Sequence, residues 1–207
     1  MTTRDQQTHS ADHVIVRADE ADIGVLAQVI AEAFFPLAVC GWLIPDGTAR
    51  RAAFPAYFRL YVEHAIADGI VETTPGRDAA ALWIPGDGPG EPPEEYAGQL
   101  AAITGPHLGR FLAFDQQLDR HHPAGVFHEH LAILAVRPDR QGQGTGTALL
   151  DARHADLEDQ GIPAYLEASD ERTRRIYLAH GYTDRGSPIE FAPGVRMYPM
   201  WRQLRPR

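Results

Sequence analysis

Hydrophobic positions along the chain change their period several times, and these changes predict an α/β protein. Apolar residues alternate in some short runs, which is typical of strands, and recur at three- and four-residue spacing in longer runs, which is typical of helices. The sequence predicts, in order, a strand at 13–18, a helix at 21–35, a helix at 46–68 and strands at 69–73 and 78–84. Asp19 or Asp22 can cap the first helix, and Asp46 or Thr48 the second. The three strands are expected to form a meander.

The segment after these strands predicts an insertion. Residues 85–93 are rich in proline and glycine and indicate a loop. Residues 94–121 have helical character, so a loop and helical insertion is expected over 85–123. Near the end of the chain, residues 194–201 read as a strand, and Pro199 indicates a place toward the sheet edge because proline donates no backbone hydrogen bond.

The most informative stretch joins an apolar run to a glycine-rich turn. Residues 131–136 are apolar without alternation, which suits a strand buried on both faces, and Pro138 then ends it. Gly142, Gly144 and Gly146 permit positive φ and a close backbone approach, and good helix formers follow. The free N–H groups of such a helix start favour a phosphate. An ordinary strand-to-helix connection is the alternative.

Two common phosphate-binding classes do not fit this turn. A triphosphatase loop ends in Gly-Lys-Ser or Gly-Lys-Thr, but Thr145 and Gly146 follow Gly144, and the chain contains no lysine. A dinucleotide fingerprint would require a third glycine at Thr147 and a place near the start of the chain. The remaining pattern is Gln-x-x-Gly-x-Gly, beginning at Gln141.

Charge narrows the class of partners. The 207 residues carry a formal net charge of -9, so nucleic acid and anionic membranes are poor partners, whereas a cationic small-molecule amine is electrostatically favoured. The hydrophobic content of 44% indicates a folded domain, and the length fits a single one, expected at 13–207 after a disordered leader at 1–12. The single cysteine, Cys40, excludes an internal disulfide, and no apolar run is long enough for a membrane span. A cytoplasmic protein, monomeric or homodimeric, is expected.

Together these motifs resemble the GCN5-related N-acetyltransferases (GNAT). The resembling segments are Val136-x-Pro138, the turn at 141–146, the strand-like segment at 161–169, and Tyr177-x-x-x-Gly181-Tyr182. Over 131–182 the likeness is strongest to puromycin N-acetyltransferases and their bacterial relatives. It implies a single α/β domain with a mixed, twisted sheet of about six to seven strands, flanked by helices, with the helical insertion before the fourth strand.

The resemblance also implies acetyl-CoA as co-substrate and assigns residues to it. The backbone of the fourth strand would pair with the pantetheine arm, and the glycine turn would hold the pyrophosphate. Thr173 stands where many family members have asparagine, and Arg172 is one of three arginines within reach of a CoA phosphate. The implied cofactor-binding residues are Leu134, Ala135, Val136, Gln141, Gly142, Gln143, Gly144, Thr145, Gly146, Thr147, Arg172 and Thr173.

Acetyl transfer requires a base for the amine and an acid for the departing thiolate. His130 lies where several family members carry a base, and Glu129 competes for this role, although strand alternation turns it to the other face. Tyr177 matches the family tyrosine that serves as acid. A solvated strand end and a packed helix aromatic are the structural alternatives for these residues.

Residues near both ends of the domain are candidates for the acceptor pocket. Phe35, Trp42 and Tyr198 are predicted to bind substrate, with a core role as the alternative. The histidines at 121–130 invite a metal interpretation, but their spacing is not that of a helical metal motif, and no metal is expected.

The expected function is acetyl-CoA-dependent N-acetylation of a small amine, including an antibiotic or xenobiotic amine, by direct transfer in a ternary complex. Two alternatives remain open. One is a protein N-terminal or lysine acetyltransferase, which needs an open peptide groove that the insertion disfavours. The other is a CoA-binding regulatory module without turnover.

Overall fold

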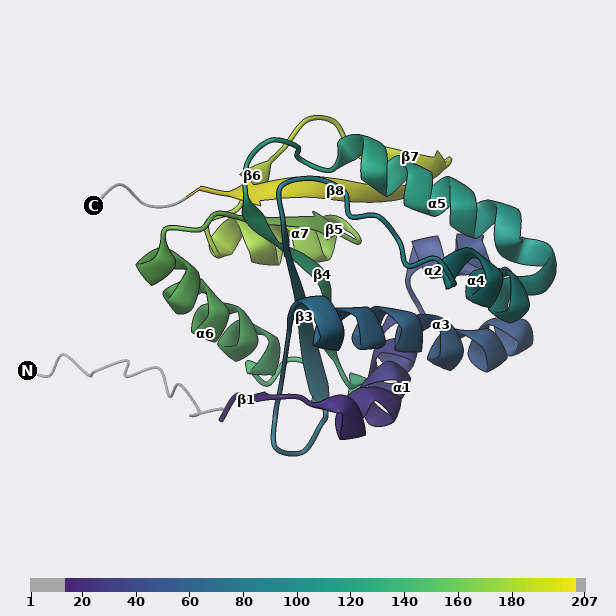
Figure 1. Ribbon diagram of the computed structural model, residues 1–207, viewed down its shortest axis with the longest axis horizontal. Coiled ribbons are helices and arrows are strands. Elements are labelled where there is room, and N and C mark those ends of the chain that lie inside the picture. Colours follow the sequence, from purple (N-terminus) through teal and green to yellow (C-terminus); the bar gives the residue numbers. More distant parts are fainter. Residues whose placement is uncertain (1–13, 204–207) are drawn as a thin grey trace, which may run out of the picture.

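The chain folds into a mixed β-sheet with helices on both faces (Figure 1). The computed structural model describes residues 14–203, so the leader expected at 1–12 lies outside the described residues. The strands are β1 (Val16–Arg17), β2 (Ile70–Thr73), β3 (Ala79–Gly86), β4 (His128–Val136), β5 (Ala164–Ala168), β6 (Thr183–Asp184), β7 (Ile189–Ala192) and β8 (Val195–Arg202). The sheet exceeds the expected six to seven strands because short β6 and β7 both pair with β8.

The helices follow the predicted order, with one addition. They are α1 (Ile23–Phe34), α2 (Ala38–Leu43), α3 (Gly47–Asp68), α4 (Tyr96–Thr104), α5 (Leu108–His121), α6 (Thr145–Gln160) and α7 (Glu171–Ala179). Asp46 caps α3 by accepting a hydrogen bond from the Ala49 N–H at 2.7 Å. Asp19 caps a 3-10 turn at Glu20–Asp22 that leads into α1. Helix α2 was not expected, because Pro36 and Gly41 obscure its short pattern.

The order of strands in the sheet is β1-β2-β3-β4-β5-β8-β6. Strands β1, β2 and β3 are antiparallel to one another, so the expected three-stranded meander is confirmed, and β4 adds antiparallel to β3. Strands β4 and β5 are parallel, and α6 makes the crossover between them. The expected helical insertion is also present, because α4 and α5 separate β3 from β4.

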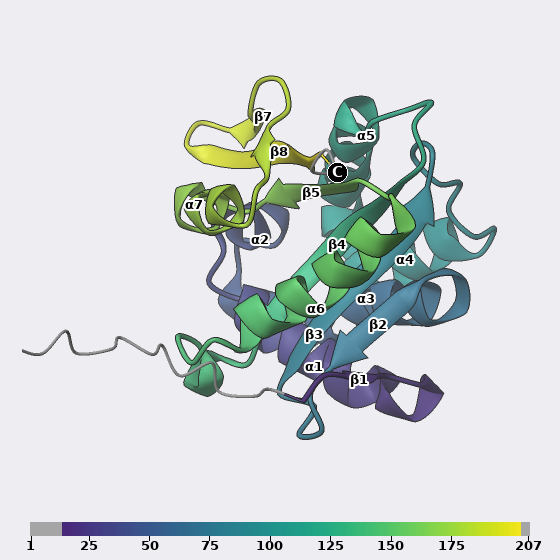
Figure 2. The same cartoon turned by 90° about the vertical axis from the view of Figure 1, so that its left-hand side faces the viewer.

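Two hydrophobic clusters occupy opposite faces of the sheet. Ala80 and Leu82 of β3 point toward the cluster formed with α1 and α3, whereas Ala81 and Trp83 point toward the cluster formed with α6. In Figure 2, α6 lies in front of β3 and β4, and α1 and α3 lie behind them. A large apolar side chain buried in this way stabilises the fold by about 1.5–3 kcal/mol. The sheet centre is therefore fixed from both sides.

Strand β8 is not at an edge, which corrects the expectation drawn from Pro199. It lies between β5 and β6 and pairs with β5 along 198–202. Pro199 is tolerated because β7 pairs with β8 up to Met197 and β6 only from Met200. On the side of β8 that faces away from β5, the Pro199 carbonyl accepts a hydrogen bond from the Arg185 N–H. The backbone N–H that proline lacks would point to this same side, where no strand pairs with Pro199.

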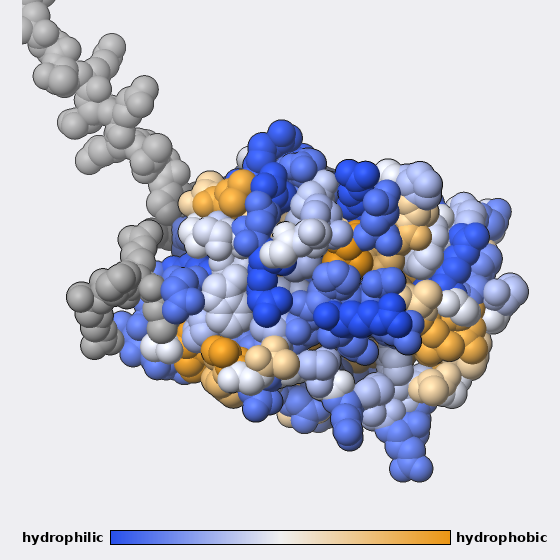
Figure 3. Space-filling view, turned by 90° about the horizontal axis from the view of Figure 1, so that it is seen from above, coloured by the Kyte–Doolittle hydropathy of each residue, from blue (hydrophilic) through white to orange (hydrophobic). Residues whose placement is uncertain are grey.

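The outer surface is largely polar. Figure 3, which looks down on the side of α5 and β8, shows hydrophilic residues interrupted by separate hydrophobic patches. Among residues 14–203, no helix combines the length and apolar character that crossing a bilayer requires.

Candidate active site

Strands β4 and β5 separate at the middle of the sheet. Their pairing covers Glu129 with Ala164 and His130 with Tyr165. On the other side of β4, Leu82 pairs with Ile133 and Trp83 pairs with Leu131, so Ala132 is an extra, bulged residue. Past this bulge, residues 134–136 remain paired with β3 alone. Their β5-facing backbone groups can therefore bind an extended ligand, as the prediction for Leu134, Ala135 and Val136 requires.

The glycine-rich turn connects β4 to α6 with the expected backbone conformation at two positions. Gly142 and Gly144 have φ of 76° and 89°, a region that favours glycine. Gln141 fixes the turn by donating from Nε2 to the Val136 carbonyl at 3.0 Å. Gly146 differs from expectation because it belongs to α6, where an added Cβ would meet Val136 at an ordinary 3.6 Å.

Helix α6 begins without a side-chain cap. Its N-cap is Gly144, and the Ala148 N–H is the one that donates to the Gly144 carbonyl, at 2.9 Å. The amide groups of Thr145, Gly146 and Thr147 precede this bond and lack intrahelical acceptors. This helix start and the separated strands meet at the end of β4, where an anionic group would be favoured.

Helix α7 lies beside β5 and carries three of the predicted residues. Tyr177 packs its ring 5.7 Å from the ring of Tyr182, and burial raises the pKa of Tyr177. Thr173 takes part in the N-terminal capping box of α7, in which its N–H donates to Asp170 Oδ1 at 2.7 Å and its hydroxyl accepts from Asp170 N at 3.1 Å. Arg172 is exposed. The cofactor role of Thr173 and Arg172 remains a prediction.

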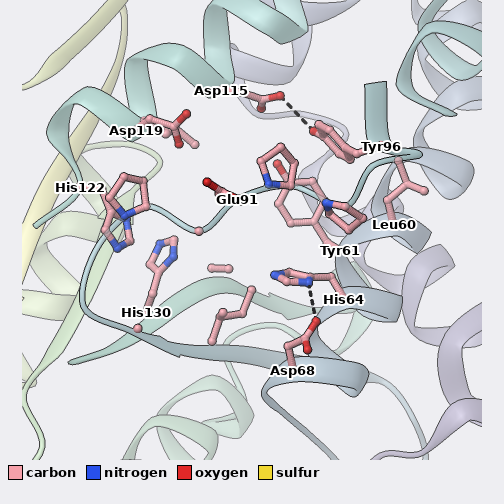
Figure 4. Close-up of a pocket in the computed structure, with 18 of the residues that line it drawn as sticks. Leu60, Tyr61, His64, Asp68, Glu91, Tyr96, Asp115, Asp119, His122 and His130 are labelled. Carbon is pink, nitrogen blue, oxygen red and sulfur yellow. Dashed lines mark hydrogen bonds and ion pairs between the residues drawn. The ribbon is translucent and has the colours of Figure 1, made fainter. Parts of the chain in front are cut away.

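A cavity of about 600 Å³ opens on the α3 face of the sheet, beside the bulge (Figure 4). Helices α3, α4 and α5, the 85–95 loop and strands β4 and β5 contribute to its wall. The lining includes the bulged Ala132 and the polar residues Tyr61, His64, Tyr96, Asp115, Asp119, His122, His130 and Glu167. Of the three predicted catalytic residues, His130 lines this cavity.

His130 forms a close pair with a carboxylate from the neighbouring strand. Its Nε2 lies 2.9 Å from Glu167 Oε2, and the Glu167 side chain is 4% exposed. Burial by itself raises the pKa of Glu167, but the adjacent His130 outweighs it and holds that pKa below its usual range. An ionised carboxylate only accepts hydrogen bonds, so Nε2 of His130 is the donor. In the neutral ring, Nδ1 then carries the lone pair that can take a proton.

Two further histidines extend this group. His128 Nδ1 lies 2.7 Å from the Val126 carbonyl, and His128 Nε2 lies 3.0 Å from His122 Nε2. Burial lowers the pKa of His128 and lowers that of His122 to about 3, so both rings are neutral at pH 7. Because a carbonyl only accepts, His128 donates from Nδ1, and His122 donates to it from Nε2. The His122 ring stands 4.9 Å from the His130 ring.

Within residues 14–203, one group of side chains has donors close enough together for a metal ion. Ligand atoms of His122, His130 and Glu167 all lie within 4.8 Å of one another. Two imidazoles and a carboxylate suit several divalent metals. The set that the sequence suggests is different, the histidines at 121–130 with Glu129, because the pairing that brings Glu167 beside His130 joins strands distant in the chain. The expectation of no metal is not tested by the structure.

Glu129 faces away from the cavity, as the strand alternation predicts. Its Oε1 accepts from Arg153 Nη2 of α6 at 2.8 Å, and the two side chains are 6% and 7% exposed. The structure therefore places this candidate base in a buried ion pair on the opposite face of the sheet from His130.

The three predicted substrate-binding residues lie outside the cavity. Phe35 stacks under Arg50 and Arg51, each 4.4 Å from its ring centre. Trp42 packs against Phe191 at 5.4 Å between ring centres. Tyr198 lies under Arg174 of α7. They are not brought together, and their substrate role remains a prediction.

Several cavity residues were missed by sequence reasoning. Glu167 lies in the strand-like segment at 161–169, but its place beside His130 depends on the parallel pairing of β4 with β5. Tyr96, Asp115 and His122 come from the insertion. A sequence signal for this wall exists on the predicted helix at 105–121. Asp115 and Asp119 are one helical turn apart there, so their side chains share one face of the helix.

Comparison with known proteins agrees with this architecture. Residues 118–204 match the family model of the acetyltransferase (GNAT) domain. A stretch of 64 residues is 34% identical to a mycothiol acetyltransferase from Propionibacterium freudenreichii. That match covers 30% of this chain and only 20% of the relative.

Solved structures extend the likeness to the whole domain. A structure described as histone acetyltransferase HPA2 and related acetyltransferase, from Corynebacterium glutamicum, has a TM-score of 0.71 with 24% identity, covering 94% of this chain and 98% of that one. A polyamine N-acetyltransferase from Drosophila melanogaster, which forms N-acetylagmatine, has a TM-score of 0.56 with 17% identity, covering 92% and 98%. At these identities the likeness shows the fold.

The chain is thus a single α/β domain of the GNAT type, with separated central strands and a glycine-rich turn at the start of α6. The family model covers residues 118–204, and the solved acetyltransferase structures share this fold.

Proposed function

We propose that this protein transfers the acetyl group of acetyl-CoA to the amine of a small molecule. The observation that carries the proposal is the Glu167–His130 pair, which lines a 600 Å³ cavity at the bulge where β4 and β5 part. A base at this point can act on an amine that enters from the cavity while the pantetheine arm lies between the strands.

In the proposed mechanism, both substrates bind before transfer, and no acyl-enzyme forms. His130 Nδ1 takes a proton from the attacking amine, and Glu167 holds the ring through Nε2 and stabilises its charged form. Tyr177 donates its proton to the departing thiolate. A tyrosine hydroxyl is protonated at neutral pH, as this role requires. Burial raises the pKa of Tyr177 further, so the family match and not this shift supports its role as acid. Cys40 takes no part, because it is buried and its pKa is raised to about 12.

On the cofactor side, the proposal assigns the pyrophosphate to the turn at 141–147. The positive φ values of Gly142 and Gly144 and the free amide groups at the start of α6 support this assignment. The β4 backbone at 134–136 pairs with the pantetheine arm, and Arg172 and Thr173 of α7 bind farther along it. Acetyl-CoA supplies the thioester, and the protein residues position it.

The walls of the cavity favour a small acceptor over a protein chain. Residues 85–95 and helices α4 and α5 cover the space in front of His130, where a peptide acetyltransferase needs an open groove. We propose an amine metabolite or an antibiotic or xenobiotic amine, such as puromycin, as acceptor. The similar fold of a polyamine N-acetyltransferase agrees with a small amine.

The test is release of CoA thiol from acetyl-CoA across a panel of small amines, with puromycin and a peptide panel alongside. Release with a small amine supports the proposal, and release with peptides alone overturns it in favour of a protein acetyltransferase. Thermal stabilisation by CoA without release for any amine favours a regulatory module. The assay is repeated after EDTA treatment, and an unchanged rate is expected because His130 acts without a metal.

A further inference from the structure

The acceptor cavity is strongly acidic beyond the needs of catalysis. No arginine is among its lining residues, and the chain has no lysine. Eight carboxylates line it: Glu63, Asp68, Asp87, Glu91, Glu95, Asp115, Asp119 and Glu167. Some have local partners, such as Arg59 for Glu63 and His64 for Asp68. Among residues 14–203, Asp115 and Asp119 of α5 form no ion pair; Asp115 is half-buried and Asp119 is exposed.

Asp115 is the clearest case of a carboxylate without a cation. It is half-buried, and its Oδ2 accepts from the Tyr96 hydroxyl at 3.0 Å. Burial raises the pKa of Asp115 to about 6, although the bond from Tyr96 opposes this shift. Tyr57 and Tyr61, whose hydroxyls lie 3.0 Å apart, add polar groups on α3. A neutral hydroxyl satisfies one oxygen of Asp115 but leaves its charge uncompensated.

Asp119 places a second charge one helical turn farther along α5, on the same face. Burial and then the negative charge of Glu167 raise the pKa of Asp119. Figure 4 shows Asp119 between the His122–His130 group and Asp115. Like charges held near one another in a partly buried space favour a cation between them.

Glu167 provides an independent sign of a missing partner. Its side chain is 4% exposed, and its Oε2 faces His130 Nε2. Its other oxygen, Oε1, is buried and forms no hydrogen bond that meets the distance and angle criteria among the described residues. The Tyr165 hydroxyl is nevertheless close enough to act on the pKa of Glu167, after burial and His130. A buried carboxylate oxygen in a cavity wall favours a donor from a ligand.

From these contacts we propose that the cavity binds a second ammonium group of the acceptor between Asp115 and Asp119, so that diamines and polyamines are its preferred substrates. This inference rests on the proposed acetyl transfer. One amine must lose its proton at His130 to react, whereas the remote amine remains an ammonium ion and pairs with the α5 carboxylates. Tyr61 and Tyr96, which line the cavity, can also contact this ammonium.

The experiment compares α,ω-diamines of three to six carbons with the monoamines of equal chain length. For the wild-type protein, kcat/KM for the best diamine should exceed that of its monoamine by about 10- to 100-fold, the effect of one hydrogen bond to a charged group. In Asp115→Asn this ratio should fall toward one. Asparagine keeps the acceptor for Tyr96, so the local packing is retained.

The control is Asp159→Asn, which removes the same charge from an exposed position on α6, outside the cavity. Its diamine preference should equal that of the wild type. Calorimetric titration of the CoA-bound protein with each amine measures the same preference without turnover. Equal binding of diamine and monoamine by the wild type overturns the inference, even if both are acetylated.

Failure of the inference can be told apart from failure of the proposed function. If monoamines and diamines are acetylated equally well, acetyl transfer stands and the ammonium site falls. If no amine releases CoA but diamines bind selectively through Asp115, the ammonium site stands and the transferase assignment falls. A preference that persists in Asp115→Asn also overturns the proposed site.

Discussion

Glu167 Oε2 lies 2.9 Å from His130 Nε2, across two parallel strands whose pairing ends at this level. The carboxylate fixes which ring nitrogen carries the proton, and the bulge at Ala132 lies two residues farther along β4. In the proposed mechanism, this site combines an oriented base, a space for the acceptor and an unpaired strand edge for the cofactor arm.

Substitution His130→Gln should reduce kcat by about two to four orders of magnitude, because it removes the proposed base. The KM for acetyl-CoA should stay close to the wild-type value, since the cofactor residues lie elsewhere. Steady-state kinetics with the best small amine measure both constants. A kcat within threefold of wild type would remove His130 from the mechanism.

Substitution Glu167→Gln tests the orienting role. The amide oxygen can still accept from His130 Nε2, but the charge that stabilises the imidazolium is lost. We expect kcat to fall about tenfold, less than for His130→Gln. The double variant should be no slower than His130→Gln alone, because Glu167 acts through His130. Additive losses would show an independent role for Glu167.

Substitution Tyr177→Phe should lower kcat by about two orders of magnitude or more, while the aromatic packing persists. Tyr182→Phe is the matched control, because its ring lies 5.7 Å from that of Tyr177 and its hydroxyl pairs with His154 Nε2 at 3.0 Å. The control should lose about 1 kcal/mol of unfolding free energy and little activity. Equal activity losses in the two variants would contradict the assignment of Tyr177 as acid.

Substitution Gly144→Ala should raise the KM for acetyl-CoA about tenfold or more. The φ of 89° costs a Cβ-bearing residue about 1–2 kcal/mol and would shift the turn that presents the α6 amides. Gly186→Ala is the matched control, because Gly186 has φ of 77° but lies in the β6–β7 connection. It should show a similar stability loss by thermal melting and an unchanged KM.

The sequence indicated the α6 turn because positive φ leaves a local signature in glycine. Helix α3 was also correctly placed, since Asp46 supplies a local cap. These features depend on residues close in the chain, so a single sequence carries them.

The cavity could not be read in the same way because its parts are distant in the chain. His130 and Glu167 are 37 residues apart and meet through the crossover by α6. The bulge at Ala132 depends on the register of β3 against β4, which no local pattern specifies. Pro199 correctly indicated a backbone position without strand pairing. The position is unpaired because it falls between the segments of β8 that pair with β7 and with β6, and not because β8 lies at the sheet edge.

The buried pair of Glu129 and Arg153 predicts a structural role for Glu129. Arg153→Met should cost about 3–5 kcal/mol of unfolding free energy, because it leaves the carboxylate buried without its partner. The double variant Glu129→Leu with Arg153→Met should recover most of this loss, as urea unfolding can measure. Glu129→Gln should keep kcat near the wild-type value, and a hundredfold loss in a folded protein would restore Glu129 as a candidate base.

Glu72 on β2 predicts a pH dependence of stability. Burial raises the pKa of Glu72 from 4.5 to about 7, even though Arg153 opposes the shift. Between these values the folded chain holds a proton that the unfolded chain releases. The contribution of Glu72 to stability is therefore complete below pH 4.5 and is lost as pH rises through 7.

Glu72→Gln should remove this loss. At pH 8 the variant should be more stable than the wild type by about 1–2 kcal/mol, allowing for the partial exposure of the side chain, and at pH 5 the two should be nearly equal. Urea unfolding at both pH values gives the comparison, with the exposed Asp159→Asn as charge control. A stability difference that is the same at pH 5 and pH 8 would mean that Glu72 ionises normally in the folded chain. Arg153 of α6 would then compensate the negative charge of Glu72 as well as that of Glu129.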